Sequence, residues 1–198
     1  TWLELQGRPS VEDEQESKRK SICTSRSFAQ MIDDEKELTL RISDFAAICA
    51  KKLRSEKTAA YTVGVFIQTN HFREDLSQYD PWYSINLDVP ASSTREIVSA
   101  ALQVLKSIYR PGYKYKRAGV IVMDIVDNDD IQTTLFDFDA KARERDDKIS
   151  QVMDKVNKSG KNILRLATQR PGHYADGIRC DFRSGLFSTQ WNDLIEVH

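Results

Sequence analysis

The sequence predicts an α+β fold: a β-α-β-β-α-β domain with two helices on one face of a four-stranded antiparallel sheet, followed by a small α+β C-terminal region. Segments of β-type and helical hydrophobic periodicity alternate in that order between residues 21 and 123. The chain has 198 residues, 40% of them hydrophobic, which is enough for one full core and a smaller appendage. After Met123 the composition changes abruptly and aspartates crowd the sequence, so we expect the domain to end near there.

The first half of the domain holds three predicted strands and one helix. Ser21–Phe28 is a short β-type run, and Leu38–Glu56 carries apolar residues at helical spacing along one face. Ala60–Thr69 is rich in β-branched and aromatic residues, whereas apolar and polar residues alternate through Trp82–Val89. We therefore expect one mostly buried strand followed by one half-buried strand.

The second half of the domain is predicted to be one helix and one strand. Ser93 and Glu96 form a capping box, in which each polar side chain satisfies a free backbone amide at the helix start. Pro111-Gly112 ends this helix, and Ala118–Met123 is the last strand. Two helices on one face leave the other face of the sheet open.

The rest of the chain divides around this domain. We expect an end segment and charged linker over residues 1–16, the main domain over residues 17–127, an acidic tether over residues 128–140 and a weakly patterned C-terminal extension over residues 141–198. Within the extension, the spacing of apolar residues predicts a helix over Lys141–Lys158 and a strand over Asn162–Thr168.

The net charge of −1 conceals an uneven distribution. Residues 17–123 hold 17 Lys and Arg against 11 Asp and Glu, a balance of +6, whereas the remaining residues hold 12 against 19, a balance of −7. A positive middle favours an anionic partner. No apolar run approaches the roughly 18 residues of a membrane span, and no secretory signal is present. Three widely spaced cysteines argue against a disulfide framework or structural zinc, so we expect a reducing, cytoplasmic setting.

Catalytic candidates are few. His71, His173 and His198 lie far apart without a serine or cysteine motif beside them. Asp124, Asp127 and Asp129 leave the end of a strand, where Mg²⁺ ligands are often found, but a solvated acidic loop is the favoured interpretation. Cys23 and Cys49 occupy positions that we expect to be ordinary core positions.

A sugar-phosphate backbone is the better-supported ligand. Thr24-Ser25-Arg26-Ser27 offers hydroxyl and cationic donors in succession, and Gly64 and Gly119 within strands would let a backbone approach the sheet. The other candidate contacts are Lys51, Lys52, Arg54, Lys114, Lys116 and Arg117. A solvated basic surface, with the glycines marking bulges, is an equally weighted alternative. The third strand lacks the aromatic pattern of RNA recognition modules, so base stacking is not expected.

The acidic tether contains a short peptide suited to docking. Gln132 can place its amide in a polar notch while Leu135 and Phe136 enter an apolar pocket. The alternative is that both apolar side chains pin the tether onto the domain.

Taken together, these residues resemble a known family: the C-terminal part of UmuC-type Y-family translesion DNA polymerases, the class of the DNA polymerase V catalytic subunit. The likeness covers nearly the whole chain in the same order, including the terminal Ser188–Val197. The stretches that carry it are Ile22–Phe28, Ala50–Arg54 with Val65–Thr69, Tyr113–Val120 and Gln132–Asp137.

The resemblance implies a role for each region. Residues 17–127 would be the little finger, which grips primer–template backbones in the major groove, and Thr1–Gly7 would be the end of the thumb. Gln132–Phe136 would bind the β sliding clamp, with reduced affinity because Thr133 stands where the consensus usually has Leu. The extension would contact a UmuD′-like subunit and RecA.

The same resemblance places the catalytic carboxylates and their Mg²⁺ in a palm that, like the fingers, is absent from this sequence. We therefore expect no catalytic residue, metal or cofactor in the chain and no polymerisation by it, while the intact protein would be a DNA-directed DNA polymerase. Its setting would be SOS DNA repair and mutagenesis near the bacterial nucleoid. DNA-backbone binding that does not depend on base sequence suits this task, because lesions occur at any position in DNA.

Two functions of other classes compete with this hypothesis. The chain could be a protein-interaction module that docks the clamp and SOS partners with little DNA binding of its own. It could also be a Mg²⁺-dependent phosphotransfer enzyme that uses Asp124, Asp127 and Asp129.

Overall fold

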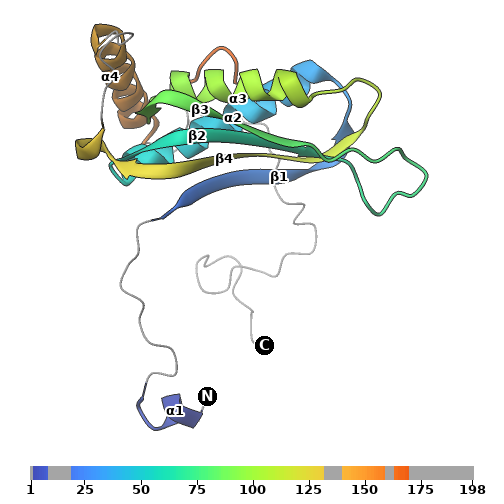
Figure 1. The fold of residues 1–198 in the computed structure, drawn as a ribbon, viewed down its shortest axis with the longest axis horizontal. Helices are drawn as coiled ribbons and strands as arrows, with labels where there is room; N and C mark the ends of the chain where they lie inside the picture. Colours follow the sequence, from blue (N-terminus) through green and yellow to red (C-terminus); the bar gives the residue numbers. More distant parts are fainter. Residues whose placement is uncertain (1, 9–18, 132–139, 159–162, 170–198) are drawn as a thin grey trace, which may run out of the picture.

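The computed structural model describes residues 2–8, 19–131, 140–158 and 163–169. Two helices pack on one side of a four-stranded sheet, and a further helix stands at one end of the sheet (Figure 1). The elements are α1 (Trp2–Leu5), β1 (Ser21–Ile32), α2 (Glu35–Ser55), β2 (Thr58–Gln68), β3 (Trp82–Ala91), α3 (Thr94–Ile108), β4 (Tyr115–Asp127), the 3₁₀ helix η1 (Asn128–Asp130) and α4 (Ala140–Asn157).

The sheet has the strand order β1-β4-β2-β3, and every neighbouring pair is antiparallel. β4 therefore lies between β1 and β2, and β2 lies between β3 and β4, so two split βαβ units are interleaved. The predicted α+β class, with its β-α-β-β-α-β order and antiparallel sheet, is confirmed. β1 and β3 are the edge strands, and each leaves a row of backbone groups without a strand partner in the sheet.

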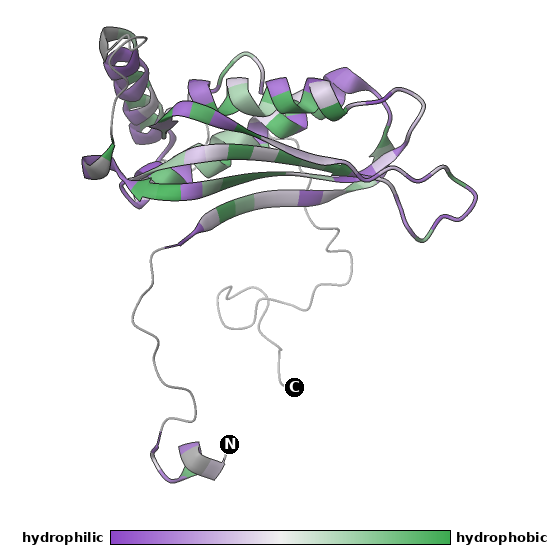
Figure 2. Ribbon diagram, viewed as in Figure 1, coloured by the Kyte–Doolittle hydropathy of each residue, from purple (hydrophilic) through white to green (hydrophobic). Residues whose placement is uncertain are grey.

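One apolar core lies between the helices and the sheet. Leu38, Ile42 and Leu53 of α2 and Ile97 and Leu105 of α3 are almost fully buried against inward-facing strand residues. In Figure 2 the hydrophobic residues of both helices lie on the side that faces the strands. Burying such side chains contributes roughly 1.5–3 kcal/mol each, which fixes which face of the sheet is covered.

Both long helices begin at side-chain caps. Asp34 accepts hydrogen bonds from the backbone amides of Lys36 and Glu37, both at 3.3 Å. The Ser93 half of the capping box predicted before α3 is confirmed, because Ser93 Oγ accepts from the Glu96 amide at 3.3 Å. The Glu96 half differs from the prediction: Glu96 Oε2 accepts from the Ser93 hydroxyl, at 2.6 Å, and not from the Ser93 amide. These contacts satisfy amides that have no partner within the helix, so each helix starts at a defined residue.

The extension begins with α4, which packs against the ends of α2 and α3. Arg54 of α2 binds Asp154 of α4 through two bonds of 2.7 and 2.9 Å, and Ser150 Oγ accepts from the Thr94 amide at 3.1 Å. The predicted helix is confirmed, but the strand expected over Asn162–Thr168 is wrong for the described residues 163–168, which form an irregular segment and a turn. No helix in the described ranges is long and apolar enough to cross a membrane.

Candidate nucleic-acid interface

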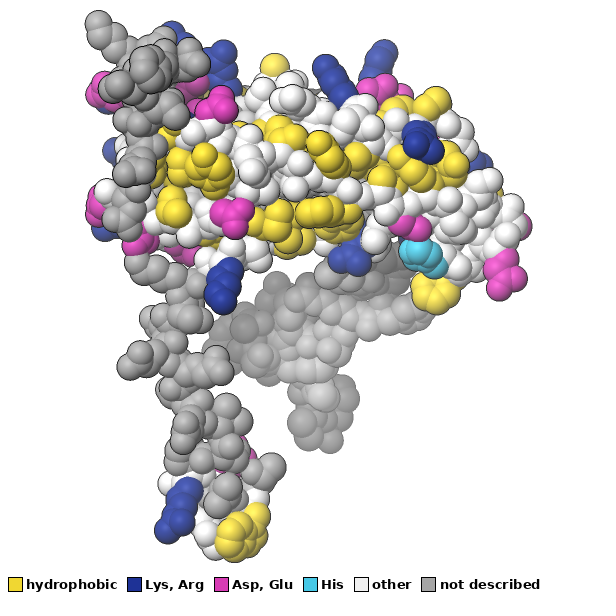
Figure 3. Space-filling model, viewed as in Figure 1, with side chains coloured by type: hydrophobic (Ala, Val, Ile, Leu, Met, Phe, Trp, Pro, Cys, Tyr) yellow, Lys and Arg dark blue, Asp and Glu magenta, His cyan; other side chains and the backbone are white. Residues whose placement is uncertain are grey.

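The face of the sheet opposite α2 and α3 is not covered by any helix of the described chain. Strand alternation and register place on it the β1 side chains Cys23, Ser25 and Ser27, together with residues of β4, β2 and β3. Arg117 lies near one end of this open face, and Asp124 lies near the other, where its Oδ2 accepts from Thr62 Oγ1 at 2.5 Å. Hydrophobic side chains form a band across the domain, with Lys and Arg side chains scattered around it (Figure 3).

The β1 edge brings together several of the predicted backbone-binding residues. Ser25 Oγ accepts a hydrogen bond of 3.1 Å from Arg117 Nη2, and Ser27 is the register partner of Arg117 on the same face. Arg26 is exposed and projects to the helix side of this edge strand, because its register partner Ala118 is buried. Lys114 is exposed in the turn that leads into β4. Two cations, two hydroxyls and the unpaired edge of β1 therefore lie within one region, with Lys114 just before the start of β4.

An aromatic row crosses the open face next to these residues. Trp82 of β3, Phe66 of β2, Gly119 of β4 and Ser25 of β1 are successive register partners across the four strands. The Phe66 ring lies over Gly119, since a Cβ built on that glycine would meet Phe66 Cζ at 2.4 Å. The Arg117 guanidinium carbon is 5.5 Å from the centre of the same ring, which is within cation–π range.

The glycines have a different role from the one predicted. The space above Gly119 is filled by Phe66, and a Cβ on Gly64 would lie 3.4 Å from Trp82 Nε1 and 3.0 Å from Ile121 Cγ2. Gly119 accommodates the protein's own ring, and Gly64 lies beside another, so neither leaves a clear approach for a sugar-phosphate chain. Sequence reasoning missed Trp82 and Phe66 as site residues. The alternation of side-chain direction along the third strand could have identified Trp82, because it places Trp82 on the same face as the polar residues Ser84 and Asn86.

Two predicted backbone-binding cations are engaged within the protein. Lys116 Nζ donates to the carbonyl oxygens of Phe28 and Ala29 at 2.6 and 3.3 Å, where β1 shifts register. Arg54 has a side chain only 11% exposed and bridges Asp154 and the Ser92 carbonyl. Arg54 therefore faces α4, and Lys116 spans the irregularity in β1. That these two residues contact DNA stays a prediction.

The remaining predicted residues lie in the helix layer or turn toward it. Lys51 and Lys52 are on α2, across the sheet from the open face. Thr24 faces α2, and its Oγ1 accepts from Cys49 Sγ at 3.2 Å. Burial raises the pKa of the Cys49 thiol, and the hydrogen bond to Thr24 opposes this rise. Cys49 is a core residue as expected, whereas Cys23 is exposed on the open face, so that part of the prediction is wrong.

The described residues do not assemble a metal site. No group of three or more His, Cys, Asp or Glu side chains within the described ranges has suitable geometry. Asp124 is held by Thr62 on the sheet.

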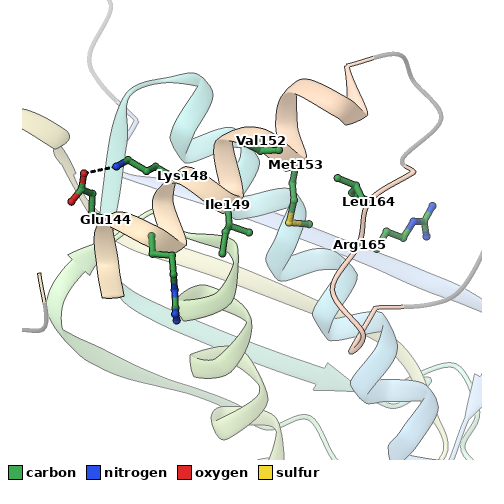
Figure 4. A pocket seen from close by; sticks show the side chains of 8 residues that line it. Glu144, Lys148, Ile149, Val152, Met153, Leu164 and Arg165 are labelled. Atoms are coloured by element: carbon green, nitrogen blue, oxygen red, sulfur yellow. Dashed lines mark hydrogen bonds and ion pairs between the residues drawn. The ribbon is translucent and has the colours of Figure 1, made fainter. Parts of the chain in front are cut away.

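An apolar groove lies between α4 and the segment 163–166. Its volume is about 590 Å³. Ile149, Val152 and Met153 of α4 face Leu164 across it, and Lys148 pairs with Glu144 at 2.6 Å on its rim (Figure 4). The groove therefore combines an apolar floor with a charged margin. The predicted docking residues Gln132, Leu135 and Phe136 lie outside the described residues.

Comparisons with known proteins match the chain along most of its length. Residues 19–135 match the impB/mucB/samB family C-terminal domain, and residues 147–197 match a domain of unknown function, DUF4113. The UmuC protein of Salmonella typhimurium is 31% identical over 200 residues, covering 100% of this chain and 47% of that protein. The ImpB protein of the same species is 29% identical over 196 residues, covering 98% and 46%.

Two further similarities each cover about three-fifths of the chain. A DNA polymerase IV of Staphylococcus aureus is 28% identical over 120 residues, covering 61% of this chain and 32% of that protein. The solved complex of a β-clamp processivity factor and the little finger domain of PolIV is 14% identical with a TM-score of 0.41, covering 59% of this chain and 98% of the other. The chain spans about half the length of the curated UmuC-type relatives it matches.

Proposed function

The chain belongs to the impB/mucB/samB family, as the C-terminal region of a UmuC-type protein, and we propose that its sheet domain binds the primer–template backbone for a translesion DNA polymerase. In this proposal residues 17–127 act as the little finger, and polymerisation with its Mg²⁺ belongs to other parts of the intact enzyme. The observation that carries the proposal is the juxtaposition of Ser25, Arg26, Ser27 and Arg117 at an unpaired sheet edge beside an uncovered face.

The chemistry of this edge suits phosphate. Arg117 gives one N–H to Ser25, and its other N–H groups are available to a second acceptor because guanidinium carries five. The Arg26 side chain makes no hydrogen bond or ion pair with any described residue. Hydroxyls and backbone amides of β1 supply further donors that bind phosphate oxygens without reading bases.

Salt dependence tests this proposal. If the protein neutralises three phosphates of the DNA, its affinity for a primer–template duplex should fall roughly 40-fold between 50 and 200 mM salt. The measurement is fluorescence anisotropy with two duplexes of equal length and unrelated sequence. Equal affinities and a steep salt slope support backbone gripping. An affinity that does not change with salt concentration, or that depends strongly on the base sequence of the duplex, contradicts it.

A second function, clamp docking, is proposed from the tether sequence. Gln132, Leu135 and Phe136 present an amide followed by two apolar side chains, which matches the pattern of a peptide that inserts into an apolar pocket. Replacing Leu135 and Phe136 together with Ala should abolish binding to the β sliding clamp and leave duplex binding unchanged. If clamp binding survives the double replacement, this peptide is not the docking site.

Partner contacts in the extension are proposed from the family alone. Residues 141–198 would contact a UmuD′-like subunit and RecA during SOS mutagenesis in the bacterial cytoplasm. The groove against α4 is the first described surface to probe, because Val152 on it is exposed. Val152→Asp should lower capture of the purified subunit, with sheet-domain stability as the control; unchanged capture excludes this groove.

A further inference from the structure

We propose that Trp82, the exposed ring of the aromatic row on the open face, stacks on unpaired bases of single-stranded DNA beside the duplex, with Arg117 over Phe66 as a neighbouring cation. This inference rests on the proposed function for the identity of the ligand as DNA. It adds a base-dependent component to a surface that otherwise contacts only the backbone, and it assigns that component to Trp82.

The positions of the rings carry the first step. Trp82 is 55% exposed on a strand that is packed into a folded sheet, so a large part of its apolar surface faces solvent. Its indole lies against Gly64, and Phe66 lies over Gly119. Backbone without side chains under both rings lets them lie close to the sheet, as a surface for another flat group requires.

The charge around the rings carries the second step. The Arg117 guanidinium lies over Phe66 and is fixed by its bond to Ser25, which places a planar cation beside the aromatic surface. Arg side chains both stack on bases and bind phosphates. Ser25 and Ser27 add neutral donors, and the carboxylate of Asp124 lies near the other end of the face, where it accepts a hydrogen bond from Thr62. The row therefore complements a polyanion with exposed base faces.

The geometry of nucleic acids indicates that the bound bases belong to a single strand and not to a duplex. In a duplex the faces of each base are covered by its neighbours, so an aromatic side chain can stack only on a base that has left the stack. Every base has such a face, so the contact would not discriminate sequence. Template strand ahead of a primer terminus supplies unpaired bases next to the duplex that the β1 edge would bind.

The test compares three probes on the full chain. These are a dT oligonucleotide, an abasic oligonucleotide of the same length and charge, and a blunt duplex. Wild-type protein should bind the dT strand at least about fivefold more tightly than the abasic strand, the lower limit for one stacked base. Trp82→Leu should remove this difference, and Trp82→Phe should restore most of it.

A neighbouring residue provides the matched control. Tyr83 is on the same edge strand and 52% exposed, but its register partner Val65 is buried, so it points to the helix side. Tyr83→Leu should leave the dT-to-abasic ratio unchanged. Thermal unfolding of all three variants establishes that they are folded.

The outcomes separate this inference from the proposed function. Loss of the dT preference in Trp82→Leu with duplex affinity kept supports stacking. A dT-to-abasic ratio near one in wild type, or a ratio that Trp82→Leu leaves intact, overturns it whatever the duplex result. Failure of duplex binding with the dT preference retained overturns backbone gripping and leaves stacking supported.

Discussion

At the scale of single residues, the close packing of Phe66 over Gly119 makes a sharp stability prediction. Gly119→Ala would place a methyl group 2.4 Å from Phe66 Cζ and 2.5 Å from Ser25 Cβ. The ring can swing away, but Ser25 Cβ is fixed to the neighbouring strand. We expect a loss of roughly 1–3 kcal/mol in the free energy of unfolding, measured by urea denaturation.

Gly64→Ala is the matched comparison. Its new methyl group would lie 3.0 Å from Ile121 Cγ2 and 3.4 Å from Ser84 Cβ, so small side-chain movements relieve the contact. The cost should be clearly smaller than at Gly119. Equal costs at the two positions, or a stabilising Gly119→Ala, would show that the ring does not lie as described.

Residue types alone identified the hydrogen-bond donors of the site well. They predicted less well where each donor side chain points. Ser25, Ser27 and Arg117 were predicted from their chemistry, and they do share one region of the sheet. Arg54 and Lys116 have the same chemistry, but each is bound to an acceptor distant in sequence. Which acceptor a cation meets depends on the packing of helices and on strand register, and a local pattern contains neither.

At the scale of elements, the attachment of α4 to the sheet domain depends on a partly buried ion pair. Asp154→Ala would leave the Arg54 cation, only 11% exposed, with the Ser92 carbonyl as its remaining described acceptor. Removing one partner of a buried pair leaves an uncompensated charge. We expect faster hydrogen exchange throughout α4, by roughly tenfold or more, with unchanged protection in β2 and β4.

Asp146→Ala is the control for this prediction. Asp146 is itself 12% exposed, but its partner Arg95, at 3.4 Å, is 67% exposed. Removing the carboxylate therefore leaves a solvated cation and costs at most about 1 kcal/mol. Exchange in α4 should change little. If both variants loosen α4 equally, the Arg54–Asp154 contact has no special role.

Element types followed from the sequence more reliably than the sheet they build. Periodicity predicted both long helices and all four strands, and the Ser93 capping box predicted where α3 starts. β1 runs on to Ile32, beyond the predicted end at Phe28, because a register shift after Ser27 lets pairing resume with Tyr115. Such irregularities depend on the partner strand, so the pattern of one strand does not contain them.

At the scale of the whole molecule, the uncovered face follows from the order of elements. Two split βαβ units put α2 and α3 on one face, so the residues on the other face had to suit solvent or a ligand. The positive balance of residues 17–123 was visible in composition. The aromatic row was not, because Trp82 and Phe66 become neighbours only once β2 and β3 pair in register.

The most direct test of the account is duplex binding by two charge-reversal variants, measured as the slope of log affinity against log salt. Arg26→Glu changes the β1 edge, whereas Lys106→Glu changes an exposed residue of α3 in the helix layer. We predict that Arg26→Glu weakens binding severalfold and lowers the salt slope by about 1, while Lys106→Glu matches wild type. If Arg26→Glu binds as wild type does, or Lys106→Glu is the weaker binder, the sheet edge is not the DNA-binding surface.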